Sequence, residues 1–218
     1  MPGALIDLVA IEASLYALVE AESACGARLT CGGCEPMTPD GARRMLEGYA
    51  YVNCLLRDGV ELFRYGASMH WLELNHVVLC GSTPATRAQY RDHMAETERW
   101  FYEQIGSRIE WGAITRSRDP VWWAAHVFLH ITSSPQLFIE GNTRTATLIA
   151  SYILASGGSA PLVMTPENRA DFCRISDACA ELSRGGARTL YAYPRLWLQL
   201  VRFLRTRSDT GFLLAATP

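Results

Sequence analysis

An acid, a glycine turn and an arginine follow one another closely near the middle of the chain. Glu140 precedes Gly141 and Asn142, which turn the chain, and residues 143–155 have the composition of a helix. The first N–H groups of a helix lack intrahelical partners, and the helix dipole adds partial positive charge there. That end suits a phosphate group, and Arg144 in the first turn offers a planar fork of donors to phosphate oxygens.

Glu140 adds the type of ligand that a hard cation requires. Proteins usually hold Mg²⁺ through one or two carboxylates together with the phosphates of a substrate. The apolar residues before it, Leu137, Phe138 and Ile139, are expected to anchor the loop on the protein. The stretch therefore predicts a site for a nucleotide phosphate, with Glu140 as the Mg²⁺ ligand.

The stretch 135–145 resembles the signature of the Fic/Doc family, His-Pro-Phe-x-Asp/Glu-Gly-Asn-Gly/Lys-Arg-x-x-Arg. The matching residues are Phe138, Glu140, Gly141, Asn142 and Arg144. The resemblance implies an all-helical fold that binds Mg²⁺ and a nucleoside triphosphate, with ATP as the expected nucleotide. Members of the family move a nucleotidyl (AMP-type) or phosphoryl group onto a hydroxyl, usually of a protein.

The same resemblance assigns roles to the residues of the loop. It implies that Glu140 holds the metal and that Asn142 and Arg144 contact the phosphates. Phe138, Gly141 and Thr143 complete the predicted nucleotide-binding set, which comprises Phe138, Gly141, Asn142, Thr143 and Arg144.

The chain departs from the signature where the family places its proton chemistry. Gln136 stands where the family has its general base histidine, and Leu137 replaces the following proline. Thr143 replaces the usual glycine or lysine, and Thr147 replaces the second arginine. An amide does not take up a proton at neutral pH, and a positioned base contributes about 10²- to 10⁴-fold in rate. The motif therefore predicts the type of ligand better than the reaction.

Other residues are candidates for the missing role. Gln136 is expected to hydrogen-bond either a ligand or the loop backbone. His126 and His130 lie one helical turn apart, and His130 is close enough in sequence to act as a displaced base or to be a structural helix histidine. Ser134 is a weaker candidate because its hydroxyl needs activation. The candidate catalytic set is His130, Gln136 and Glu140.

Many family members carry an inhibitory helix with Ser/Thr-x-x-x-Glu-Gly/Asn. Glutamate followed by glycine or asparagine occurs at positions 47, 140 and 167, and none has a serine or threonine four residues earlier. We therefore expect no intramolecular glutamate switch. An acidic side chain from another segment that plugs the site would contradict this expectation.

Composition limits the partners. The 218 residues are expected to form one domain spanning 1–218, with 49% hydrophobic residues to build its core. The net charge of −2 gives no electrostatic basis for a nucleic-acid or membrane partner. All 20 basic residues are arginine, which excludes Schiff-base chemistry and the lysine-dependent P-loop.

Seven cysteines, no signal-like N-terminus and no apolar run long enough to span a bilayer predict a reduced, cytoplasmic protein. Cys31 and Cys34 form a single C-x-x-C pair. It is interpreted as incidental reduced thiols or as half of a zinc site, for which no second pair follows at a suitable spacing.

The elements that position the site are predicted to be almost entirely helical, with at most a short strand or hairpin. The expected helices span 4–24, 39–56, 84–105 (ended by Gly106), 120–132, 143–155 and 166–182, with one or two more within 58–80 and a last one from Pro194. Residues 108–115 are predicted to be a short strand or an irregular segment. Oxygen-bearing residues before proline mark four helix starts: Thr38-Pro39, Thr83-Pro84, Asp119-Pro120 and Thr165-Pro166.

The segment 143–155 has almost no polar face, so it is expected to be a buried central helix whose N-terminus alone reaches the surface. Three functions remain open. The first is a divergent Fic-like transferase acting on a protein or other hydroxyl. The second is a catalytically silent module that binds a nucleotide or a protein, and the third is an enzyme of unrelated small-molecule chemistry in the same pocket. Self-association is left open.

Overall fold

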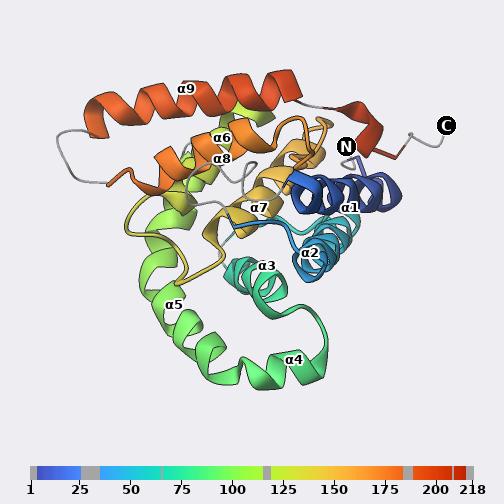
Figure 1. Ribbon diagram of the computed structural model, residues 1–218. Coiled ribbons are helices and arrows are strands. Elements are labelled where there is room, and N and C mark those ends of the chain that lie inside the picture. Colours follow the sequence, from blue (N-terminus) through green and yellow to red (C-terminus); the bar gives the residue numbers. More distant parts are fainter. Residues whose placement is uncertain are drawn as a thin grey trace.

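The described part of the chain is all-α. The computed structural model describes residues 4–25, 35–64, 66–114, 119–183, 189–207 and 209–214, with 25 and 106–114 as backbone only. Its helices are α1 (Leu8–Cys25), α2 (Pro39–Arg57), α3 (Ser68–Cys80), α4 (Pro84–Gln89), α5 (Arg91–Ile114), α6 (Pro120–Thr132), α7 (Asn142–Ser156), α8 (Arg169–Ala180) and α9 (Thr189–Arg207), followed by the 3₁₀ turn η2 (Thr210–Phe212). α7 lies in the middle of the molecule, and α9 runs across one side of it (Figure 1).

The predicted helical class is confirmed, but two details within 84–115 are wrong. Tyr90 separates α4 from α5, and α5 then continues through Gly106 as far as Ile114. The expected strand or irregular segment at 108–115 is therefore helical up to residue 114. A glycine in a helix interior costs only about 0.5–1 kcal/mol relative to alanine, which is too little to end a helix by itself. Strand-like pairing in the described residues is confined to two isolated bridges, Ile6–Leu213 and Ser134–Ser183.

Three of the four proline-marked helix starts are confirmed. The Oγ1 of Thr38 accepts a hydrogen bond from the Gly41 N–H at 3.0 Å, and Asp119 Oδ1 accepts one from the Val121 N–H at 2.9 Å. α4 also begins directly after Thr83, although no side-chain bond caps it. These short polar side chains supply acceptors for N–H groups that the helix cannot satisfy internally.

Two predicted starts are displaced. α8 begins at Arg169, after a turn in which the Asn168 side chain accepts a hydrogen bond from the Thr165 N–H at 3.0 Å. The described part of α9 begins at Thr189, so Pro194 lies inside this helix rather than in its first turn.

The two N-terminal predictions also need adjustment. α1 begins at Leu8 rather than at residue 4, because Asp7 Oδ1 accepts a hydrogen bond from the Val9 N–H at 2.9 Å and caps it. Residues 58–80 contain one α-helix, α3. Within the described ranges, no helix combines the length and hydropathy needed to cross a bilayer.

The central position of α7 has a clear sequence origin. Most of its side chains are buried, as its apolar composition predicted, and it packs against α6, α2 and α3. Gly48 on α2 makes one of these contacts possible, because a Cβ atom there would lie 2.4 Å from a methyl of Leu148. The packed neighbours hold α7 in place, and its N-terminal end opens onto a cavity.

Candidate functional site

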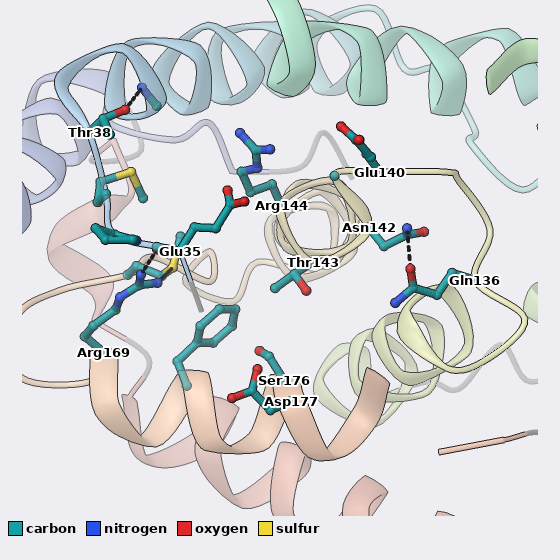
Figure 2. Close-up of a pocket in the computed structure, with 16 residues that line it drawn as sticks. Glu35, Thr38, Gln136, Glu140, Asn142, Thr143, Arg144, Arg169, Ser176 and Asp177 are labelled. Atoms are coloured by element: carbon teal, nitrogen blue, oxygen red, sulfur yellow. Dashed lines mark hydrogen bonds between the residues drawn. The ribbon is translucent and has the colours of Figure 1, made fainter. Parts of the chain in front are cut away.

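A cavity of about 490 Å³ lies at the N-terminal end of α7. Three parts of the chain form its walls: the segment 35–38 before α2, the loop 136–141 with the first turn of α7, and one face of α8 (Figure 2). The volume falls within the roughly 300–1,000 Å³ of sites that enclose small organic ligands. The segments are far apart in sequence, so only the fold brings them together.

The first turn of α7 faces this cavity. Its N-cap, Gly141, has a left-handed backbone with φ of 72°, and no side chain caps the helix. Asn142, Thr143 and Arg144, which begin the helix, all line the cavity. Their N–H groups precede the first intrahelical donor, so they are available to an anion.

Close packing on α3 fixes the glycine turn. A Cβ atom on Gly141 would lie 3.1 Å from Asn75 Nδ2 and 3.3 Å from methyl groups of Leu79 and Val78. Asn75 Nδ2 also donates to the Glu140 carbonyl at 2.9 Å. Only glycine combines this conformation with this approach, so α3 holds the turn where the cavity begins.

Arg144 extends from α7 into the cavity lining and is half-buried. Its Nη1 donates to the Val78 carbonyl at 2.9 Å. Burial lowers the pKa of the Arg144 guanidinium, and the negative charges of Glu35 and Glu140 oppose this shift. An arginine remains charged even so, and the hydrogen bond to α3 leaves further N–H donors for a ligand.

Glu140 lies at the mouth of the cavity, where its side chain is 65% exposed. Its Oε2 is 3.9 Å from His93 Nε2, too far for a hydrogen bond. No group of three or more metal-ligating side chains occurs in the part of the chain that the structure describes. A single accessible carboxylate fits Mg²⁺ that arrives with phosphate ligands of its own, rather than an ion held by the protein alone.

The Asn142 side chain is committed to the loop itself. Its Oδ1 accepts a hydrogen bond from the Phe138 N–H at 2.8 Å, and its Nδ2 donates to the Phe138 carbonyl at 2.8 Å. The same Nδ2 donates to Gln136 Oε1 at 3.0 Å. Both amide hydrogens are used, so a ligand contact from Asn142 would go through its backbone N–H.

Gln136 hydrogen-bonds the last residue of α6 and the side chain of Asn142. Its Nε2 donates to the Thr132 carbonyl at 3.3 Å, while its Oε1 accepts from Asn142. The side chain therefore bridges the end of α6 and the start of α7, and it also lines the cavity. An amide with this pattern shapes the loop and has no basic atom to offer.

α5 supports the outside of the loop, a contact that no sequence pattern predicts. Phe138 is fully buried and stacks on Phe101, with ring centroids 5.3 Å apart. Trp100 Nε1 donates to the Gln136 carbonyl at 3.2 Å. Phe138, assigned to nucleotide binding by resemblance, is thus an anchor that does not line the cavity.

Two further candidates also lie outside the cavity lining. His130 is half-buried near the end of α6, and Ser134 is tied by its backbone N–H to the Leu182 carbonyl at 2.8 Å. The predicted residues that line the cavity are Gln136, Glu140, Gly141, Asn142, Thr143 and Arg144. The pair Cys31 and Cys34 lies outside the described residues.

Glu35 enters the cavity from the segment before α2, and its side chain points toward Arg144 (Figure 2). Glu35 lines the cavity without filling it, so the expectation that there is no intramolecular glutamate switch stays a prediction. Its neighbourhood is held by a buried ion pair, Arg169 Nε to Glu22 Oε1 at 2.7 Å, with both side chains 4% exposed. Arg169 also donates to the Glu35 carbonyl.

The opposite wall belongs to α8, which sequence reasoning did not associate with the site. Ser176 and Asp177 line the cavity across from the first turn of α7 (Figure 2). Ser176 is 3% exposed, and its Oγ has no hydrogen-bond partner. No local motif marks these residues, because their proximity to α7 depends on how α8 packs.

Comparison with known proteins supports the fold. No protein-family model matches the chain, and no curated protein matches it in sequence. A crystal structure of a Fic domain-containing signaling protein from Bacteroides thetaiotaomicron VPI-5482 is similar, with a TM-score of 0.50 and 15% sequence identity. The match covers 89% of this chain and 86% of that one. The chain therefore has a Fic-like helical fold.

Proposed function

We propose that the protein is a divergent Fic-like transferase that binds a Mg²⁺-nucleoside triphosphate, with ATP as the expected nucleotide. It moves a nucleotidyl or phosphoryl group to a hydroxyl. The observation that carries this proposal is the uncapped first turn of α7, which opens onto a cavity also lined by Arg144 and Glu140. Backbone donors and a guanidinium suit the phosphates, and an exposed carboxylate suits the cation bound to them.

The charge of the cavity supports a ligand that brings a cation with it. Three carboxylates (Glu35, Glu140, Asp177) and two guanidiniums (Arg144, Arg169) line the cavity. Arg169 is already paired with Glu22, which leaves Arg144 to balance the acids of the lining. Bound Mg²⁺ cancels two of the negative charges of a nucleoside triphosphate, so it lowers the repulsion that a bare polyphosphate would meet here.

One observation favours the second hypothesis, a catalytically silent module that binds a nucleotide or a protein. Gln136 occupies the position of the family's base, and both ends of its amide are engaged within the loop. A module of this type would bind the nucleotide without transferring any part of it. Binding and transfer therefore require separate measurements.

Binding is tested by calorimetry and thermal shift with ATP, GTP, CTP and UTP, each with and without Mg²⁺. A ligand that binds only the native state raises its stability, by about 2.7 kcal/mol at a hundred times its Kd. Arg144→Gln and Glu140→Gln are expected to weaken Mg²⁺-dependent binding at least about tenfold, as expected for loss of a charge-assisted contact. Arg64→Gln, which changes a 75% exposed arginine, is the matched control.

Transfer is tested with the same nucleotides labelled at the α or the γ phosphate. Label from the α position on protein indicates nucleotidyl transfer, and label from the γ position indicates phosphoryl transfer. Binding without either label would favour the silent module. Absence of binding by all four nucleotides would refute the proposal.

A further inference from the structure

The loop that resembles the family signature accounts for one side of the cavity only. The first turn of α7 and Arg144 are suited to bind a phosphate, but Gln136 has no basic atom and His130 lies outside the lining. In-line transfer requires the acceptor to approach phosphorus from the side opposite the leaving group. The acceptor is therefore expected to lie against another wall of the cavity.

The wall opposite α7 has the polar groups that such an acceptor needs. Ser176 lines the cavity and is nearly completely buried, and its Oγ has no hydrogen-bond partner. A buried hydroxyl left unsatisfied is uncommon in folded proteins, and a ligand group is one way to satisfy it. Asp177 follows directly on α8 and places a carboxylate on the same wall (Figure 2).

We infer that this face of α8 is the acceptor subsite, where Ser176 binds an acceptor hydroxyl and Asp177 takes its proton. The inference rests on the proposed function. A carboxylate also receives the substrate hydroxyl proton in protein kinases, so the low basicity of an aspartate does not prevent this role.

The step balances without an additional reactant. The acceptor oxygen attacks phosphorus as its proton passes to the Asp177 carboxylate, and a new O–P bond forms. The bond from phosphorus to the bridging oxygen breaks, and that oxygen keeps the electron pair. The leaving group is pyrophosphate in nucleotidyl transfer and a nucleoside diphosphate in phosphoryl transfer.

The test compares two acid-to-amide variants of the same helix. Asp177→Asn removes the proposed base. Asp171→Asn removes an exposed carboxylate that pairs with Arg174 and Arg207 outside the cavity. Each full-length protein is incubated with Mg²⁺ and with ATP, GTP, CTP or UTP labelled at the α or γ phosphate. The label is measured on the protein itself, on proteins of a lysate, and in solution as the product of transfer to water (hydrolysis).

Asp177→Asn is expected to lower transfer to every acceptor at least about 100-fold. Its nucleotide affinity, measured by calorimetry, is expected to stay within about threefold of wild type, which also shows that the variant folds. Asp171→Asn is expected to keep the wild-type transfer rate and the wild-type nucleotide affinity. Ser176→Ala is expected to raise the KM for the acceptor more than it lowers kcat.

A pH profile distinguishes a proton acceptor from a structural carboxylate. The wild-type transfer rate is expected to fall on the acid side as one carboxylate protonates, and this limb is expected to be absent from the residual activity of Asp177→Asn. The inference would be overturned if Asp177→Asn transferred the label at the wild-type rate. It would also be overturned if Asp171→Asn lost as much transfer activity as Asp177→Asn. Nucleotide binding without transfer by the wild type would also overturn it, whereas failure of nucleotide binding would refute the proposed function itself.

Discussion

The glycine turn before α7 offers a sharp test of how the site is held. Gly141 precedes α7 and Gly158 follows it, and both have a left-handed backbone, with φ of +72° and +74°. A Cβ atom at position 158 would meet nothing within 4 Å, whereas one at position 141 would meet Asn75, Leu79 and Val78 of α3 at 3.1–3.3 Å. The two Gly→Ala substitutions therefore share a backbone effect and differ in packing.

The expected magnitudes follow from this difference. A left-handed alanine costs about 1–2 kcal/mol, partly offset by about 0.4–1 kcal/mol because alanine restricts the unfolded chain. Gly158→Ala is expected to lower the free energy of unfolding by about 1 kcal/mol. Gly141→Ala adds overpacking against α3, worth about 1–3 kcal/mol, for a total of about 2–4 kcal/mol.

Urea denaturation measures the free energy of unfolding of both variants. In thermal denaturation, each kcal/mol lost corresponds to a fall of roughly 2–4 °C in Tm for a chain of this size. Nucleotide affinity is the second measurement. Gly141→Ala is expected to weaken it, because Asn75 holds the Glu140 carbonyl at 2.9 Å and has to move. Equal stability losses in the two variants would refute the reasoning that α3 fixes the turn.

Four other outcomes are expected. Glu22→Gln leaves the buried Arg169 without its carboxylate partner, and urea denaturation should show a free energy of unfolding lower by about 3–5 kcal/mol. Replacing both residues by apolar ones should lower it less. Burial lowers the pKa of His126, so the unfolded chain binds a proton at this residue more readily than the folded chain does. The free energy of unfolding should therefore be highest above about pH 6.5 and fall as the pH drops from there to the lower folded-state pKa. Replacement of the imidazole in His126→Gln should give a flatter pH profile of stability. Glu35→Gln removes a negative charge that faces Arg144, and calorimetry should show nucleotide binding up to about fivefold tighter; weaker binding would contradict this. Gln136→His places a basic imidazole at position 136, and transfer of labelled phosphate should rise at least about tenfold. An unchanged rate would show that position 136 does not reach the reacting oxygen.

The parts of the fold that local chemistry determines were predictable from the sequence. Thr38 and Asp119 begin helices because short polar side chains satisfy the free N–H groups that follow them. α7 is central because it has almost no polar face, and Gly141 marks its start because the turn needs a left-handed residue. Each of these inferences uses residues close together in the chain.

The remaining features depend on packing between distant segments. α5 continues through Gly106, and its residues Trp100 and Phe101 support the loop at Gln136 and Phe138. No periodicity in α5 indicates that contact. The cavity walls formed by Glu35 and by α8 have the same origin, because their distance from α7 is set by the whole arrangement of helices.

Gln136 explains why the signature predicts the loop better than the reaction. Its amide accepts a hydrogen bond from Asn142 and donates one to Thr132, so a single side chain ties both ends of the loop. An amide makes these two bonds as an imidazole does, with one acceptor and one donor, but it has no basic nitrogen. The shape of the loop is therefore compatible with an amide at position 136, although an amide cannot take up a proton. If the protein transfers a group, its base has to come from a wall of the cavity that the signature does not include.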